Sequence, residues 1–269
     1  MTRPDPFPAP TAPREIDALP VREVAPGAPW RWLKAGWRDF LSSFGPSVAH
    51  GLVVMLAGLA IVTVGLRAWW LLPGAISGFL LVGPVVATGL YELSRRIALG
   101  ERPTLRDAVG AWTRDARPLV WLGLGLATAA TLWVLASSVM IALFVREPIT
   151  GIDAFLRHVV LAEGALFPLW ALLGGLGAAA VFALTVVSAP LLLDRRVDLG
   201  SALLTSVRAV GRNPVPLAVW ATMIMAASAL SLATMMIGFA FVIPIVGHAS
   251  WHAYLDLVDA SAAPPRIVP

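Results

Sequence analysis

Apolar residues are concentrated in six long stretches that contain almost no charge. The stretches cover residues 52–66, 69–90, 119–144, 165–193, 215–232 and 235–246. About 20 apolar residues in a helix cross the hydrocarbon layer of a membrane, and only lipid stabilises so much continuous apolar surface. The pattern therefore predicts an all-α membrane protein with six transmembrane helices. A short turn near residues 232–234 is expected between the last two.

Three shorter segments alternate apolar and charged residues with a helical period. In residues 30–44, aromatic and aliphatic side chains recur at spacings of three and four, and basic side chains fall on the opposite face. Residues 104–117 and 198–212 follow the same plan. Helices of this kind lie in the headgroup region of a bilayer. We therefore expect three interfacial helices.

The order of these elements suggests an internal repeat. Each amphipathic segment ends at a proline-containing junction and precedes two apolar stretches, and the second stretch of each pair contains Pro84, Pro190 or Pro244. The motif Gly-Phe-x-x-Val-x-Pro-x-Val occurs at both residues 78–86 and residues 238–246. The chain is therefore expected to consist of three tandem units, each an interfacial helix followed by a transmembrane hairpin.

Basic residues are distributed unevenly between the two sides of this predicted arrangement. Six Lys or Arg precede the first span, six lie between spans two and three, four lie between spans four and five, and Arg266 follows the last. Seventeen of the 20 thus lie on one side, whereas only Arg67, Arg146 and Arg157 lie on the other. The positive-inside rule then predicts that both termini are cytoplasmic. Since anionic lipid accounts for the basic excess, we expect no nucleic acid partner.

The chain divides into three parts. Residues 1–29 contain eight prolines and are expected to form a disordered cytoplasmic tail. Residues 30–258 form the six-span domain, and residues 259–269 form a short cytoplasmic tail. The first apolar stretch begins only after Phe44, so the first span is expected to direct insertion. Cysteine is absent, which excludes disulfides and thiolate metal sites.

Candidate chemistry is confined to the predicted inner interface. His248 and His252 are four residues apart and share a helical face, and His50 is expected at a similar depth. These three histidines are the candidate ligands of a transition metal or haem, with Glu92 behind them in a supporting position. The alternative is structural hydrogen bonding, in which Glu92 and Asp194 pair with neighbouring arginines. No catalytic residues are assigned, and no cofactor is expected unless the three histidines bind one. The known motifs of soluble enzymes are missing.

Two sequence motifs carry a family resemblance. Residues 83–96 read Gly-Pro-x-x-x-x-Gly-Leu-Tyr-Glu-x-Ser-Arg-Arg, and residues 244–254 read Pro-x-x-Gly-His-Ala-Ser-Trp-His-Ala-Tyr. Across residues 30–258 the chain resembles a bacterial integral-membrane family that is known only as a domain of unknown function. Some of its members carry a provisional cytochrome c oxidase label. The resemblance implies a multi-pass protein of the bacterial inner membrane and supplies no activity.

We therefore expect a non-enzymatic accessory or scaffold protein whose surroundings are the lipid bilayer and either other membrane proteins or further copies of the chain. Two alternatives stay open at this point. The repeated proline-containing spans are compatible with a transporter or channel for a small solute or metal. The three histidines are compatible with a metal- or haem-binding membrane protein.

Overall fold

The computed structural model describes residues 17–113 and 117–266 of the chain. Within these residues the secondary structure is helical, and extended pairing is limited to two isolated bridges. The all-α prediction is thereby confirmed.

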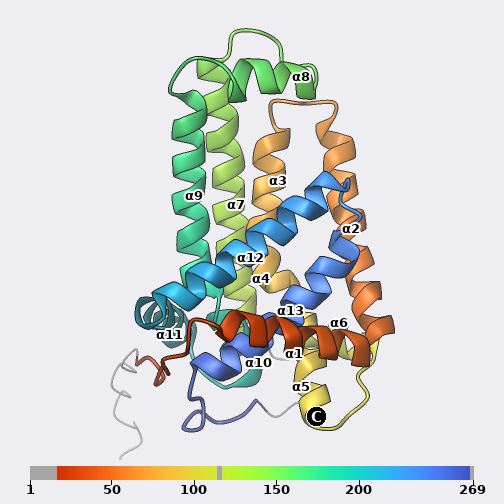
Figure 1. The fold of residues 1–269 in the computed structure, drawn as a ribbon, viewed down its shortest axis with the longest axis vertical. Coiled ribbons are helices and arrows are strands. Elements are labelled where there is room, and N and C mark those ends of the chain that lie inside the picture. The colour runs from red at the N-terminus through yellow and green to blue at the C-terminus, as the bar shows by residue number, and fades with distance from the viewer. Residues whose placement is uncertain (1–16, 114–116, 267–269) are drawn as a thin grey trace, which may run out of the picture.

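Four helices run along the long axis of the molecule (Figure 1). They are α2 (Phe44–Gly65), α3 (Leu72–Leu81), α7 (Arg117–Phe144) and α9 (Leu166–Thr185). Large apolar side chains on α2, α7 and α9 are exposed, as is expected where lipid surrounds a bundle. Examples are Val53, Leu56, Leu132, Leu143, Leu172 and Leu176. The protein is therefore an integral membrane protein with several apolar helices.

The number of spans differs from the simple count of apolar stretches. Among the described residues, four helices are long and apolar enough to cross a membrane, namely α2, α7, the continuous segment Leu166–Asp194, and α12 (Pro214–Ala233). A fifth span is present if α3 and residues 83–98 count as one helix bent by 46°. The last helix, α13 (Phe239–Leu257), is not in this group because its second half carries two histidines and Asp256. Six spans therefore remain a prediction.

Pro84 and Pro190 lie at breaks between helical segments, whereas Pro244 lies inside a continuous helix. Proline lacks a backbone N–H and its ring clashes with the carbonyl four residues earlier. Pro84 lies in the four-residue α4 (Gly83–Val86), between α3 and α5 (Thr88–Ala98). Pro190 lies in α10 (Ser188–Asp194), directly after the end of α9, and Pro244 lies inside α13.

The three expected amphipathic helices lie at one end of the molecule, the lower end in Figure 1. They are α1 (Ala28–Ser42), α6 (Leu105–Thr113) and α11 (Leu199–Arg212). The Asp198 side chain caps α11 by accepting a hydrogen bond from the Ser201 backbone N–H at 2.9 Å. The opposite end carries α8 (Ile152–Phe155) and the following η1 (Leu156–Val160). This arrangement is compatible with the predicted tandem units, which remain a prediction.

Part of the proline-rich N-terminal segment is ordered. Val21 pairs with Val258 in an antiparallel bridge, and the Leu19 and Val24 backbone N–H groups donate to Thr205 and Asn213 at 3.0 and 2.8 Å. Residues 17–27 therefore lie against the lower end of the helical domain, unlike the disordered tail expected for them. Residues 1–16 of that expected tail are outside the described part.

The hairpin α12–α13 crosses the bundle obliquely, and its turn lies well below the turn between α2 and α3 (Figure 1). The turn covers residues 234–238. A side-chain Cβ at Gly58, in the middle of α2, would lie 3.2 Å from the Met236 sulfur. Immediately after the turn, the Phe239 ring contacts the Phe79 ring of α3 at a centroid distance of 6.1 Å. The turn is thus packed against the interior of the bundle.

Candidate functional site

Four helices meet at a buried group of polar side chains near the lower end of the bundle. Asp39 and Ser43 come from α1 and its C-terminal cap, Ser47 from α2, Ser94 from α5, and His248 from α13. We call these five residues the polar ring. All five are buried, and Ser47 and His248 are fully inaccessible to solvent.

The polar ring is closed by five short contacts. His248 Nδ1 lies 2.7 Å from Ser94 Oγ, which donates to Asp39 Oδ2 at 2.6 Å. On the other side of the imidazole, His248 Nε2 lies 2.9 Å from Ser47 Oγ. Ser47 Oγ lies 2.9 Å from Ser43 Oγ, and Ser43 in turn donates to the backbone carbonyl of Asp39 at 2.9 Å. His252 joins the ring from outside through its Nε2, 2.8 Å from Asp39 Oδ2.

Sequence spacing explains how these side chains converge. His248 and His252 are four residues apart on α13 and share one face of it. Asp39, Ser43 and Ser47 are also four residues apart, and backbone hydrogen bonds of 2.9 Å from Ser43 to Asp39 and from Ser47 to Ser43 continue this spacing across the α1–α2 junction. Two glycines allow the helices to approach closely. A Cβ at Gly36 would lie 2.5 Å from the Ala249 nitrogen, and a Cβ at Gly51 would lie 2.2 Å from the Ala240 carbonyl oxygen. The side chains of α13 therefore reach both α1 and α2.

The hydrogen bonds around His248 determine which ring nitrogen carries the proton when the imidazole is neutral. Because the Ser94 hydroxyl donates its proton to the Asp39 carboxylate, the Ser94 oxygen must accept from His248. Nδ1 therefore carries the imidazole proton, and Nε2 accepts from the Ser47 hydroxyl. The Ser43 hydroxyl then shares its single proton between the Ser47 oxygen and the Asp39 carbonyl. The Nε2 lone pair, which would otherwise bind a metal, already has a partner.

His50 lies outside the polar ring. Its Nε2 donates to the Val86 backbone carbonyl at 3.0 Å, beside the break between α4 and α5. Its ring also packs edge-on against Trp112 at a centroid distance of 6.1 Å. The structure thus brings His248 and His252 together through Asp39 and connects His50 to a different group.

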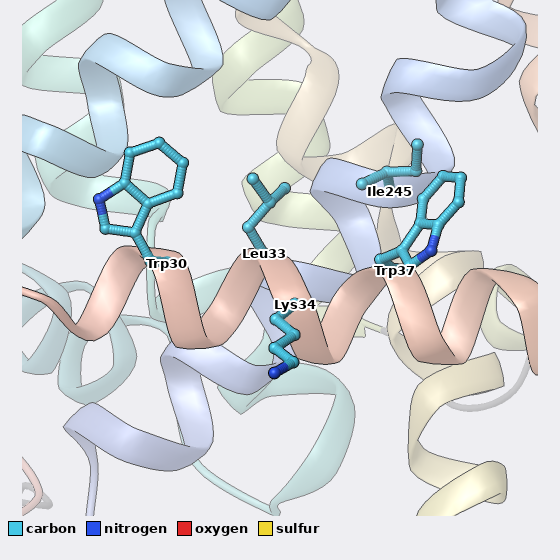
Figure 2. Close-up of a pocket in the computed structure, with 5 residues that line it drawn as sticks. All are labelled: Trp30, Leu33, Lys34, Trp37 and Ile245. Carbon is cyan, nitrogen blue, oxygen red and sulfur yellow. The ribbon is translucent and has the colours of Figure 1, made fainter.

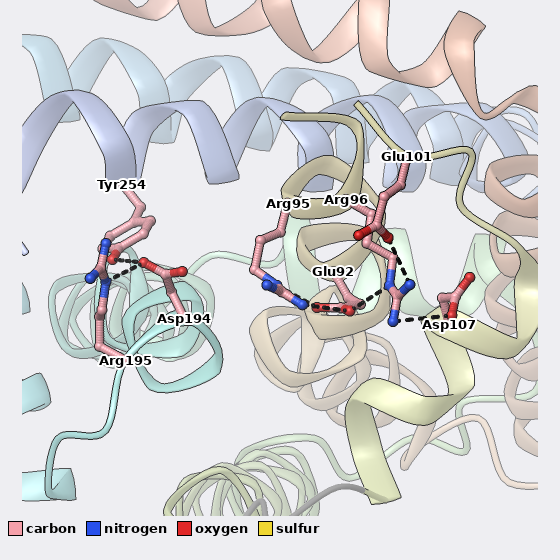
Figure 3. A network of polar contacts seen from close by, with 8 residues as sticks. All are labelled: Glu92, Arg95, Arg96, Glu101, Asp107, Asp194, Arg195 and Tyr254. Atoms are coloured by element: carbon pink, nitrogen blue, oxygen red, sulfur yellow. Dashed lines mark hydrogen bonds and ion pairs between the residues drawn. The ribbon is translucent and has the colours of Figure 1, made fainter. Parts of the chain in front are cut away.

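Glu92 belongs to a second polar cluster, shown in Figure 3. Its side chain is 1% exposed and accepts hydrogen bonds from Arg95 at 2.8 and 3.0 Å and from Arg96 at 2.8 Å. Arg96 also forms ion pairs with Glu101 at 2.8 Å and with Asp107 at 3.3 Å. Glu92 is therefore bound by two arginines of its own helix, which matches the structural alternative considered from the sequence.

Asp194 forms a third cluster at the end of α10 (Figure 3). It accepts hydrogen bonds from Arg195 at 2.8 Å and from the Tyr254 hydroxyl at 2.7 Å. Partial burial lowers the pKa of the Arg195 guanidinium, but the hydrogen bond and charge of Asp194 offset this and hold it above its ordinary value. A permanently charged Arg195 thus holds Asp194 in place beside α13.

The candidate metal ligands are not gathered around one point. In residues 17–113 and 117–266, no group of three or more His, Asp or Glu side chains is arranged to hold a metal ion. His248 uses both ring nitrogens inside the polar ring, and His50 and His252 donate from Nε2 to separate acceptors. The hydrogen bonds favour a structural role for these residues, and the metal site remains a prediction.

Sequence reasoning missed the acidic and hydroxyl members of the polar ring. Asp39 belongs by its spacing to the charged outer face of its helix, yet it is 8% exposed. A signal was nevertheless present, because Ser94 lies in the first family motif and His248 and His252 lie in the second. Motif residues that are far apart in sequence thus meet in space at this ring.

Comparisons with known proteins identify the membrane class without an activity. No curated protein and no solved structure shows significant similarity to the chain. A family model does match residues 71–194, from the residue before α3 to the end of α10. The first motif lies inside this match and the second lies outside it. The model describes a predicted integral membrane protein family (DUF2189), and its match covers slightly less than half of the chain.

Proposed function

We propose that the chain is a non-enzymatic accessory or scaffold protein of the bacterial cytoplasmic membrane. The observation that carries this proposal is the closure of the polar ring. Each of its side chains is hydrogen-bonded to another member, so the ring links α1, α2, α5 and α13 to one another. A catalytic base or nucleophile must instead reach a substrate.

The burial of the ring supports the same view. Ser47 and His248 are fully buried and Ser94 is 1% exposed, so a substrate could reach them only if the four helices separated. Buried hydrogen bonds of this kind rigidify a helix junction, because leaving one partner unsatisfied costs about 1–3 kcal/mol. The ring is therefore suited to holding the interfacial helix α1 in a fixed position on the domain.

Native mass spectrometry of the chain released directly from membrane vesicles tests the accessory role. We expect a defined assembly that contains this chain with another polypeptide or with further copies of itself. Detection of the 28.4 kDa monomer alone would contradict the proposal. Ser47→Ala serves as the structural control. It should lower the unfolding temperature, and the assembly should be lost only under conditions in which this variant unfolds.

Both termini are proposed to be cytoplasmic. Support comes from the basic helices α1 and α11, which share one end of the molecule, while Arg67 lies at the opposite end in the α2–α3 turn. The absence of cysteine makes the test direct. In intact spheroplasts, an impermeant maleimide should label Ile152→Cys, and it should label Arg102→Cys only after permeabilisation. The reverse pattern would overturn the topology.

A transporter is the second candidate, and one packing feature favours it. The bent helix formed by α3 and residues 83–98 packs against α13, which contains Pro244. Their contacts include the Phe79–Phe239 ring pair and the close approach of Gly247 to Leu90. Discontinuous helices of this kind often surround transport sites. Flux of protons or small neutral solutes into proteoliposomes above that of empty vesicles would favour this candidate, and equal flux would remove it.

A further inference from the structure

A hollow of about 460 Å³ opens on the outer side of α1. Trp30, Leu33, Lys34 and Trp37 of α1 line it together with Ile245 of α13. Figure 2 shows the two indole rings at opposite ends of the hollow, with Leu33 and Ile245 between them. Its walls are thus almost entirely apolar.

The one charged side chain lies on a different side from the apolar ones. In Figure 2, Lys34 points to the lower side of α1, whereas the two indole rings and Leu33 lie on its upper side. In the topology proposed above, Lys34 faces the aqueous side and the hollow faces the hydrocarbon. Trp30 and Trp37 remain 65% and 48% exposed, so neither indole fills the space between them.

The charges on α1 leave a local excess of positive charge beside the hollow. Arg31 is neutralised by Asp256 at 3.0 Å. Lys34 and Arg38, which lie four residues apart, form no ion pair with any carboxylate in the described part of the chain. An anion at this position would therefore meet two cations on the same helical face.

We propose that this hollow binds one anionic phospholipid from the leaflet in which α1 lies. One acyl chain occupies the space between Trp30 and Trp37, in contact with Leu33 and Ile245. The phosphate lies at the aqueous edge and pairs with Lys34. The order of groups along the hollow, from ammonium to indole to aliphatic side chain, matches the order from headgroup to hydrocarbon in a lipid.

Titration with phospholipids tests this site. The full chain in detergent is titrated with phosphatidylglycerol and with phosphatidylcholine of identical acyl chains, and bound lipid is counted by native mass spectrometry. We expect one phosphatidylglycerol per chain and weaker binding of phosphatidylcholine. Lys34→Gln should weaken phosphatidylglycerol binding about fivefold, which is the usual contribution of one cation near an anionic surface, and should reduce the preference between the two lipids.

Two further variants separate the site from general effects of charge and folding. Ile245→Trp fills the hollow and should weaken the binding of both lipids. Retained helical content shows that this variant still folds. Arg208→Gln removes one exposed charge from α11, away from the hollow, and should leave binding unchanged. Equal binding of the two lipids by the wild-type chain, or equal effects of Lys34→Gln and Arg208→Gln, would overturn the proposal.

Discussion

The hairpins α2–α3 and α12–α13 both contain a Gly-Phe-x-x-Val-x-Pro-x-Val motif, yet their turns lie in different environments. The α2–α3 turn contains Arg67, Trp69 and Trp70, residue types that are common where a helix leaves a membrane. The α12–α13 turn contains no charge and includes Met235, Met236 and Ile237. Its contact residue Gly58 lies seven residues before the end of α2, or about 10 Å along the helix.

A turn at that depth needs all its backbone donors satisfied internally, because hydrocarbon offers no hydrogen bonds. The α12–α13 turn meets this requirement. Backbone N–H groups 234 to 242 donate to backbone carbonyls, except that of Gly238, which donates to the Thr234 hydroxyl at 3.0 Å. A turn that supplies its own acceptors in this way is suited to a position below the membrane surface, where its contact with Gly58 leads us to expect it.

A charge introduced into each turn should give the largest difference between the two hairpins in the free energy of unfolding. Met235→Arg places a guanidinium within the apolar layer and should lower the free energy of unfolding by about 2–3 kcal/mol. Leu66→Arg, beside Arg67 in the other turn, should change it by less than about 1 kcal/mol. Both side chains are exposed, so lost packing is similar. Titration with sodium dodecyl sulfate measures the difference, and equal effects would place both turns at the surface.

The close approach of α13 to α2 provides the next test. A methyl group at Gly51 would overlap the Ala240 carbonyl, so Gly51→Ala should lower the free energy of unfolding by about 1–3 kcal/mol. Gly45, on the same helix, has no atom within 4 Å of the position that a Cβ would occupy, and Gly45→Ala should stabilise by up to about 1 kcal/mol. If Gly51→Ala and Gly45→Ala both stabilised the protein in thermal or detergent unfolding, the hairpin would not pack as described.

The Phe79–Phe239 pair joins the two repeated motifs directly. Replacing both residues by leucine, singly and together, should give a coupling energy of about 1 kcal/mol in a double-mutant cycle. Phe239→Leu combined with Phe182→Leu of α9 is the control and should be additive. Additivity in both cycles would mean that the motifs do not meet in the folded protein.

The smallest expected effect concerns backbone strain. Met235 has a φ of 51°, in the left-handed region that disfavours residues with a Cβ. Met235→Gly should therefore raise the free energy of unfolding by about 0.5 kcal/mol, after the greater freedom of glycine in the unfolded chain is deducted. Met225→Gly, at a similarly exposed position inside α12, should lower it by about 1 kcal/mol in the same unfolding measurement.

The sequence could predict the helical class, the three amphipathic helices and the uneven charge, because each depends on local periodicity. It could not predict the depth of the α12–α13 turn from hydropathy alone, since apolar length does not distinguish a helix that crosses from one that tilts. The structure supplies that depth when its helix bounds are compared at the repeated motif. α3 begins six residues before Gly78, whereas α13 begins one residue after Gly238, so the second hairpin is about 10 Å shorter on this side.

The candidate site was predictable only in part, for a related reason. The spacing of His248 and His252 placed them on one face, and their position near the lower end followed from the apolar pattern. The partners Asp39, Ser47 and Ser94 come from three other helices, and long-range packing alone decides which of their faces meet. A single sequence carries no direct information about that packing.

The oblique hairpin also gives the molecule an uneven cross-section. At the lower end, α1, α6, α11 and the inclined α12–α13 pair all take up lateral space, whereas the upper bundle consists mainly of α2, α3, α7 and α9 (Figure 1). Such a protein displaces more lipid from one leaflet than from the other. Its insertion is then coupled to bilayer curvature, and the chain should be enriched where the leaflet containing the interfacial helices is stretched.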